Sequence, residues 1–353
     1  MYAAESKMIA WVKTELKLAM PFLDNWHVKP APKGAASVIP DMLIDANLSG
    51  KPYSFCIEVK RSGYPQQIRD AVMVLENVRK ERPDCYPIVA APQLGSQAKS
   101  ICDDHAMGYL DTAGNVKIAT GGIIIEKSGN NGSRPDFLKN EAQTQSVFSP
   151  RASRITKCLL NEPRRAWTQK DIVAKTGLSK GMVSRIVHRM ISSGYLIEAK
   201  DKLTLSNYED LLSAWVEAGI KSKETARHFY IWSQNPKQLM ALIAQQLDRK
   251  KVKYAFTREA GASLRAPFST FEIVALYIES FNDFPVAQLS AQQADKGFNV
   301  VLLEPRDEAI IMHAQTRNGM KVADDLQLYI DLMKNPLRGQ KQAEHLLSVI
   351  RKK

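Results

Sequence analysis

One stretch constrains the fold of this chain more than any other: RRAWTQKDIVAKTGLSKGMVSRIVHRMISSGYLIEAKDKLTLS, residues 164–206. Thr168 is followed three residues later by Asp171, which is the spacing of a helix capping box, so a short helix is expected to begin there and to end at Gly177. Ser179 can cap the next helix. Apolar residues at helical spacing predict the buried face of that helix, namely Val183, Ile186, Val187 and Met190.

Elements on either side of this helix pair complete a known arrangement. A preceding helix should end near Pro163, and its buried side is marked by Ile155, Leu159 and Leu160. After Gly194, the segment LIEAKDKLTL predicts a two-stranded wing with Lys200 and Lys202 at its tip. Three helices followed by such a wing predict a winged helix-turn-helix over residues 149–207.

The third helix of this module offers a polar, basic side for a nucleic acid. We predict that it contacts DNA through Ser179, Lys180, Ser184, Arg185, His188 and Arg189, helped by Lys200 and Lys202 of the wing. Arginine pairs with guanine edges in the major groove, whereas serine and backbone N–H groups hold phosphate. Residues 151–206 carry twelve Lys and Arg against four Asp and Glu, a net charge of +8 out of +12 for the whole chain. Double-stranded DNA is the expected partner, and this binding requires no cofactor; a protein-interaction module is the alternative.

A second informative stretch, IPDMLIDANLSGKPYSFCIEVK at residues 39–60, predicts two strands around a turn at Ser49 and Gly50. Pairing centred on that turn places Asp41 directly opposite Glu58, with Cβ atoms about 5 Å apart. Because side chains alternate along a strand, Lys60 should lie on the same face as Glu58.

Two carboxylates and one ammonium on one face suit hard-cation chemistry. Mg²⁺ takes oxygen ligands and can activate a water beside a phosphate. The motif resembles the PD-(D/E)xK nuclease superfamily, which implies Asp41, Glu58 and Lys60 as catalytic residues and Asp41 and Glu58 as metal ligands. Neighbouring helices could add Glu5, Glu15, Gln66 or Gln67. The alternative is a solvated charged face on an ordinary hairpin.

The order of elements predicts a multidomain protein of mixed α/β and α class. Helices are expected near residues 2–20, 66–82 and 96–105, and strands at 38–46, 53–60, YPIVAAP, GYLD, VKIA and GGIIIEK. This alternation indicates an α/β domain over residues 1–130. A polar segment containing Pro135 predicts a linker over residues 131–148, and residues 208–353 mix helices and strands in an α+β domain.

Cysteine spacing and the lengths of the apolar runs indicate the compartment in which the protein is expected. None of the four cysteines lies in a CxxC pair, and no Cys/His set has zinc-ligand spacing, so buried thiols in a reducing compartment are expected. The N-terminus lacks the apolar centre of a signal peptide, and no apolar run approaches the roughly 18 residues of a membrane span. We therefore expect a cytoplasmic protein.

Three parts of the sequence together resemble AbiEi-type proteins of type IV toxin–antitoxin systems: GYLDTAGNVKIATGGIIIEK, residues 148–196, and the pair YAFTREAGASLRAPF and LQLYIDLMKNPLRGQKQAEHLL. Larger members of that family place a restriction-endonuclease-like domain before the winged helix. The resemblance implies a transcriptional regulator, with a toxin as a partner to be tested. Since regulators of this type often bind palindromes as dimers, a homodimer is also to be tested.

The resemblance further implies a C-terminal nucleotidyltransferase-like fold that has lost its chemistry. An active enzyme of that fold needs a Gly-Ser turn followed by two acids at D-x-D or D-x-E spacing. Residues 261–263 offer a candidate turn, but FSTFEIVALYIES contains only Glu272 and Glu279, seven residues apart. The sequence thus favours a DNA-binding regulator, and a Mg²⁺-dependent endonuclease targeted by the winged helix is the alternative.

Overall fold

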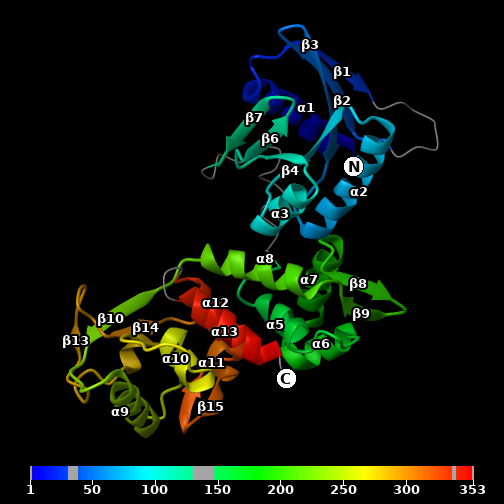
Figure 1. Ribbon diagram of the computed structural model, residues 1–353. Coiled ribbons are helices and arrows are strands. Elements are labelled where there is room, and N and C mark those ends of the chain that lie inside the picture. The colour runs from blue at the N-terminus through cyan, green and yellow to red at the C-terminus, as the bar shows by residue number, and fades with distance from the viewer. Residues whose placement is uncertain (1, 31–38, 130–146, 336–338, 352–353) are drawn as a thin grey trace. The chain divides into compact units, whose positions relative to one another are not determined.

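The computed structural model describes residues 2–30, 39–129, 147–335 and 339–351 and shows a mixed α/β, multidomain protein (Figure 1). The chain forms two compact units, one of Met1–Val147 with Glu162–Ser213 and the other of Phe148–Asn161 with Ala214–Lys353. Most of the predicted linker, residues 131–146, lies outside the described residues. No described helix combines the length and apolar character of a membrane span.

The first unit contains a seven-stranded sheet whose strands follow one another in chain order. Its strands are β1 (Asp24–Pro30), β2 (Met42–Leu48), β3 (Lys51–Val59), β4 (Cys85–Ala91), β5 (Gly108–Asp111), β6 (Val116–Thr120) and β7 (Ile123–Lys127). β3, β4 and β5 pair in parallel, and the flanking strands pair antiparallel. The strands predicted in this region are present, but residue 38, the predicted start of the first of them, lies outside the described residues, and β2 begins at Met42. β1 was missed, because only Trp26 and Val28 alternate with polar residues there.

Helices cover both faces of this sheet. α1 (Tyr2–Ala19) shares a core with Phe55 and Ile57 of β3, whereas α2 (Pro65–Glu81) and α3 (Ser96–Asp104) share another with Cys56. Side chains alternate along a strand, so Glu58 belongs to the α2 and α3 side. The four cysteines are buried thiols, as expected.

The β2–β3 hairpin has the predicted register. Ser49 and Gly50 have φ angles of 51° and 82°, the left-handed pair of a two-residue hairpin turn. Pairing runs from Leu48 opposite Lys51 to Met42 opposite Ile57. The next residues in this register are Asp41 and Glu58, so the predicted juxtaposition is confirmed.

The winged-helix elements follow the sequence prediction. They are α5 (Ser153–Asn161), which belongs to the second unit, and α6 (Gln169–Thr176), α7 (Lys180–Ser192), β8 (Leu196–Ala199) and β9 (Lys202–Leu205) of the first unit. The capping box is present, since the Thr168 hydroxyl accepts a hydrogen bond from the Asp171 backbone and the Asp171 carboxylate accepts one from the Thr168 backbone. Gly177 ends α6 with a φ of 68°.

The second unit is built on another seven-stranded sheet, of order β13-β10-β14-β12-β11-β16-β15. Its strands are β10 (Ala226–Tyr230), β11 (Tyr254–Thr257), β12 (Val274–Ile278), β13 (Gln292–Gln293), β14 (Val300–Leu303), β15 (Gln315–Arg317) and β16 (Met320–Val322). The remaining helices are α8 (Tyr208–Ile220), α9 (Pro236–Arg249), α10 (Arg258–Arg265), η1 (Phe281–Asp283), α11 (Ala309–Met312), α12 (Asp325–Met333) and α13 (Gly339–Arg351).

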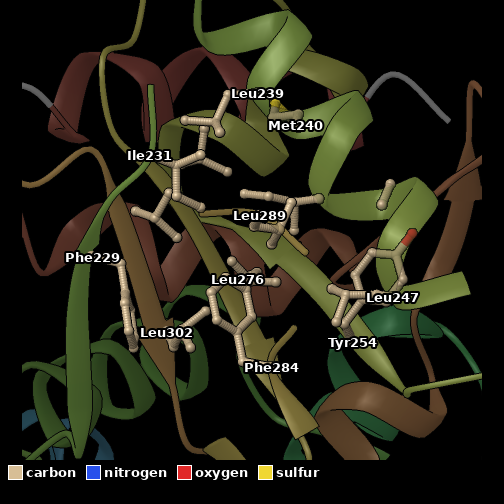
Figure 2. Packing of buried hydrophobic residues seen from close by; sticks show 14 of the residues in the cluster. Phe229, Ile231, Leu239, Met240, Leu247, Tyr254, Leu276, Phe284, Leu289 and Leu302 are labelled. Atoms are coloured by element: carbon tan, nitrogen blue, oxygen red, sulfur yellow. The ribbon is translucent and has the colours of Figure 1, made fainter. Parts of the chain in front are cut away.

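Apolar residues fill both sides of this second sheet. Figure 2 shows Leu239 and Leu247 of α9 packed with Leu276 of β12 and Leu302 of β14. A separate cluster joins α10, α12 and α13 to Ala255 of β11. The sheet is therefore the middle layer of the second unit, with an apolar core on each of its faces.

One expectation for this unit is wrong. Residues 261–263 lie inside α10 instead of forming a turn. A Cβ on Gly261 would lie 2.7 Å from the Phe256 carbonyl oxygen and 2.7 Å from a Leu328 methyl group, so glycine there permits close packing. All five residues of β12 are buried and apolar or tyrosine, so β12 carries no acidic pair for a metal.

Candidate nucleic-acid interface and carboxylate site

The predicted DNA-contacting side of α7 is open to solvent. Ser179, Lys180, Arg185 and His188 are exposed, and Ser184 and Arg189 are half-buried. The Ser179 hydroxyl caps α7 by accepting a hydrogen bond from the Met182 backbone at 3.3 Å. The predicted buried face is confirmed by Val183, Ile186, Val187 and Met190. The helix is thus fixed on one side and presents its basic side outward.

Two of the exposed side chains lie along the surface of α7. The Arg185 Nε atom donates to the Gly181 carbonyl oxygen at 3.3 Å. The His188 Nδ1 atom lies 2.8 Å from the Ser184 carbonyl oxygen. Both side chains therefore point back toward the N-terminal half of the helix, where Ser179 and Gly181 are small.

The wing has the geometry of a tight hairpin. Lys200 and Asp201 have φ angles of 50° and 59°, the pattern of a two-residue turn with both residues left-handed. Trp167 extends the wing, because its backbone N–H and carbonyl both bond to Leu203, at 2.8 and 2.7 Å. Lys200 and Lys202 are exposed at the tip.

Sequence reasoning missed Arg165 as a member of this surface. Its guanidinium lies 4.0 Å from the centre of the Trp167 ring, and it forms an ion pair with Glu162 at 2.8 Å. The local signal was the Arg-x-Trp spacing, in which both side chains project from the same side of an extended segment. A cation held over an aromatic face beside the wing adds to the basic surface.

Arg154 and Lys157, which contribute to the net charge of the winged-helix module, form ion pairs with acidic residues of the second unit. Within the second unit, Arg154 of α5 pairs with Asp307 at 2.8 Å, and Lys157 pairs with Asp324 at 2.6 Å. Their charges are offset inside the protein. The exposed basic charge of the module therefore comes from Arg165, α6, α7 and the wing.

Residues 151–198 match the IclR helix-turn-helix domain. The chain therefore carries a helix-turn-helix DNA-binding domain. No curated protein matches the chain in sequence.

Two solved structures show partial similarity. A chain of the EndoMS–dsDNA2 complex is 21% identical, with a TM-score of 0.24, over 30% of this chain and 44% of that one. EndoMS in its apo form is 18% identical, with a TM-score of 0.23, over 30% of this chain and 45% of that one. The chain thus spans less than half the length of either EndoMS chain.

The structure brings together the three residues of the predicted carboxylate site. The Asp41 Oδ2 atom, just before β2, accepts a hydrogen bond from the Val59 backbone at 2.7 Å. Lys60 Nζ donates to Glu58 Oε1 at 2.8 Å, and the Lys60 backbone donates to the Ala90 carbonyl oxygen. The end of β3 is therefore fixed against β4, with both charged side chains on one face.

Glu58 has an unusual environment for a carboxylate. Its side chain is buried, and its Oε2 atom has no hydrogen-bond partner. Burial raises the pKa of Glu58 and the nearby Asp41 charge adds to this, while the Lys60 ammonium opposes it. A buried, unsatisfied carboxylate oxygen is costly, and a cation bound there would remove that cost.

The donor set fits a cation that keeps part of its water shell. In the described part of the chain, no three His, Cys, Asp or Glu side chains gather as metal ligands. Mg²⁺ commonly uses one or two carboxylates together with waters and substrate phosphates, so Asp41 and Glu58 are sufficient in number.

The helix residues predicted as additional members of the carboxylate site do not join it in the described part of the structure. Glu15 is half-buried on α1, which packs on the other face of the sheet, and the Glu5 side chain lies outside the described residues. Gln67 accepts a hydrogen bond from the Ser62 backbone at 3.3 Å, and Gln66 donates to Asp70. Gln67 therefore braces the loop after Lys60.

Inside the first unit, the C-terminal end of α7 and the start of α8 are joined to the α/β domain. Gln67 donates to the carbonyl oxygen of Ser192, the last residue of α7, at 3.2 Å. Asp210 on α8 accepts hydrogen bonds from Arg69, at 2.8 Å for one pair of atoms, and from Gln97. The rings of Tyr64 and Tyr195 meet edge to face at 5.4 Å between centroids. These contacts anchor the end of α7 and leave its basic N-terminal half exposed.

The environment of Glu58 leads to a stability prediction. Because the pKa of Glu58 is raised in the folded state, the folded protein binds more protons than the unfolded chain between the two pKa values, and stability falls as pH rises through that window. At neutral pH, Glu58→Gln should raise the melting temperature by about 2–4 °C, the effect of about 1 kcal/mol. Below the unfolded pKa the two proteins should melt together. Thermal melts at both pH values check this; a variant that melts lower at neutral pH contradicts it.

Proposed function

We propose that this protein is a sequence-specific, double-stranded DNA-binding transcriptional regulator, with α7 as the recognition helix. The observation that carries the proposal is the exposed basic side of α7, capped at Ser179 and lying within the region that matches a helix-turn-helix domain. A capped helix N-terminus with small residues can approach a groove closely, and backbone N–H groups there favour phosphate.

Each side chain has a role in this proposal. Arg185 pairs with a guanine edge in the major groove, because a guanidinium matches the O6 and N7 acceptors of guanine. Ser179 and Lys180 hold phosphates at the start of the helix. Lys200 and Lys202 contact the backbone from the wing. Ser184, His188 and Arg189 complete the surface along the helix.

The resemblance to AbiEi-type regulators supports a narrower proposal. The target would then be the DNA upstream of the protein's own gene, and a toxin would be the partner encoded beside it. A palindromic target would call for a homodimer. The C-terminal unit, whose β12 carries no acidic pair, would serve packing or interaction.

Binding of the full chain to its own upstream DNA tests the proposal. Fluorescence anisotropy should show the upstream duplex bound at least about a thousandfold more tightly than a shuffled duplex at the same salt concentration. The affinity for both duplexes should fall linearly with the logarithm of salt concentration, since phosphate contacts release counterions. Equal affinity for the two duplexes would contradict sequence-specific recognition.

A second candidate function is favoured by a separate observation, the unsatisfied Glu58 Oε2 atom beside Asp41 and Lys60. We propose, as this alternative, a Mg²⁺-dependent DNA endonuclease. Asp41 and Glu58 would hold the metal, which when bound supplies an activated water and stabilises charge on the phosphate. Lys60 would orient the scissile phosphate.

Supercoiled DNA incubated with Mg²⁺ or Mn²⁺ separates the two functions. If the alternative holds, the wild-type chain nicks or linearises the plasmid, and Glu58→Gln reduces the rate at least about a hundredfold, because a metal ligand is lost. Glu126→Gln, at an exposed carboxylate on β7, is the matched control and should cleave normally. Intact plasmid with wild-type protein and either metal would reject the nuclease and leave the regulator proposal standing.

A further inference from the structure

The sheet of the first unit ends at β7, and neither proposed function uses this edge. Among the strands that the structure describes, β7 pairs with β6 alone, because the order of the sheet runs from β1 to β7. An edge strand presents backbone N–H and C=O groups that can pair with a strand of another chain. The outer side of β7 is therefore a candidate interaction surface.

The side chains of β7 do not protect this edge in the usual way. Natural proteins commonly place charged residues or proline along an open edge, but β7 begins with three isoleucines. Ile123 is buried in the core shared with α1, and Ile125 packs against the same core. Ile124 projects from the opposite face of the sheet and is 83% exposed. Burying this side chain against an apolar partner would be favourable.

The hairpin turn between β6 and β7 shows which backbone groups lie on the open edge. Thr120 pairs with Ile123 across two glycines with φ angles of 55° and 94°, which is the pattern of a two-residue hairpin turn. Residues that flank such a turn form a hydrogen-bonded pair, so Ile123 directs its N–H and C=O groups toward β6. Because these directions alternate along a strand, Ile124 and Glu126 direct their backbone groups toward the open edge.

The sequence of β7 is self-complementary when a second copy pairs with it antiparallel. A two-fold axis through Ile124 places that residue opposite its own copy and Ile123 opposite Ile125. The charged residues Glu126 and Lys127 then lie opposite the two turn glycines, so no like charges meet. An axis through Ile125 would instead place Ile124 opposite Glu126. An axis through Glu126 would place two carboxylates opposite each other, which is destabilising.

We propose that this chain forms a homodimer through antiparallel pairing of β7 with β7 of a second copy, with the two-fold axis at Ile124. The two Ile124 residues exchange backbone hydrogen bonds and cover each other's side chains, and the two sheets become continuous across the interface. Such a dimer would suit a palindromic DNA target. The proposal depends on the sheet edge alone, so its outcome is separate from that of the proposed function.

Sedimentation velocity on the full chain, without DNA, tests the proposal. A single five-residue strand on each copy makes a small interface, so the dissociation constant is expected to lie in the range of about 1–100 μM. The wild-type chain should change from monomer to dimer across this range of concentration. A chain that stays monomeric above it would overturn the proposal, whether or not the protein binds DNA.

Charged substitutions at the axis test the register. Ile124→Lys and Ile124→Glu each place like charges opposite each other and remove the apolar contact, so each variant alone should dimerise at least about tenfold more weakly. An equimolar mixture of the two variants should dimerise again, because lysine then lies opposite glutamate. Dimerisation of either variant at wild-type strength, or a mixture that stays monomeric, would overturn the axis at Ile124.

Met73→Lys is the matched control. Met73 is 64% exposed on α2, which packs on β3 and β4 and not on β7, so this variant should dimerise as the wild type does. Since Ile124 is exposed in the single chain, neither of its substitutions should unfold the protein, and circular dichroism checks this. If a variant at position 124 fails to fold, the concentration series on the wild-type chain still decides the proposal.

Discussion

Replacing Arg185 with alanine is expected to weaken binding to the specific DNA about ten- to a hundredfold, the effect of losing one bidentate base contact of about 1–3 kcal/mol. Arg185 is exposed on α7, and its side chain lies along the helix surface through its bond to Gly181. The loss should appear as a relaxed preference at one base pair, measured by anisotropy on a set of single-substitution duplexes. Binding to shuffled DNA should change far less.

Lys202→Ala is the matched control for this experiment. Lys202 is exposed at the end of the wing, where a phosphate contact is expected. This change should weaken binding to all duplexes about equally and reduce the salt slope by about one. If neither variant alters binding, the assignment of α7 and the wing to the DNA is wrong.

The Gly63→Ala substitution is expected to destabilise the first unit by about 3 kcal/mol or more, through a steric clash that its surroundings cannot relieve. A Cβ at position 63 would lie 1.8 Å from the Gln93 carbonyl oxygen. That contact is between backbones, because Gly63 forms a parallel bridge with Leu94. Urea unfolding, followed by circular dichroism, measures the loss.

Gly181→Ala provides the comparison, since nothing lies within 4 Å of a Cβ there. Gly181 lies inside α7, and alanine should stabilise that helix by about 0.5–1 kcal/mol. Equal stability of Gly63→Ala and wild type would mean that the loop after Lys60 does not pack against the segment after β4.

Local signals explain what could be predicted from the sequence. The hairpin register follows from a turn at Ser49 and Gly50, and the start of α6 follows from Thr168 and Asp171, because the groups involved are near neighbours in the chain. β1 was missed because its sequence carries little apolar pattern. Gly261 was misplaced because a glycine that permits close packing and a glycine that forms a turn look alike in sequence.

In the candidate sites, too, features set by neighbouring residues were predictable and features set by distant residues were not. The juxtaposition of Asp41, Glu58 and Lys60 was predictable, since strand pairing fixes it. The burial of Glu58 was not, because it depends on α2 and α3 covering that face. The partners of Arg154 and Asp210 lie more than a hundred residues away in the chain, so no local pattern could indicate them.

The central claim is that the basic side of α7 lies against duplex DNA, and photocrosslinking from position 188 tests it most directly. A benzophenone side chain placed at His188, which is exposed on that side, should crosslink to the upstream duplex. The same group at Glu126, exposed on β7 outside the proposed interface, is the control and should not. Crosslinking from position 126 but not from position 188, with DNA bound, would contradict the account.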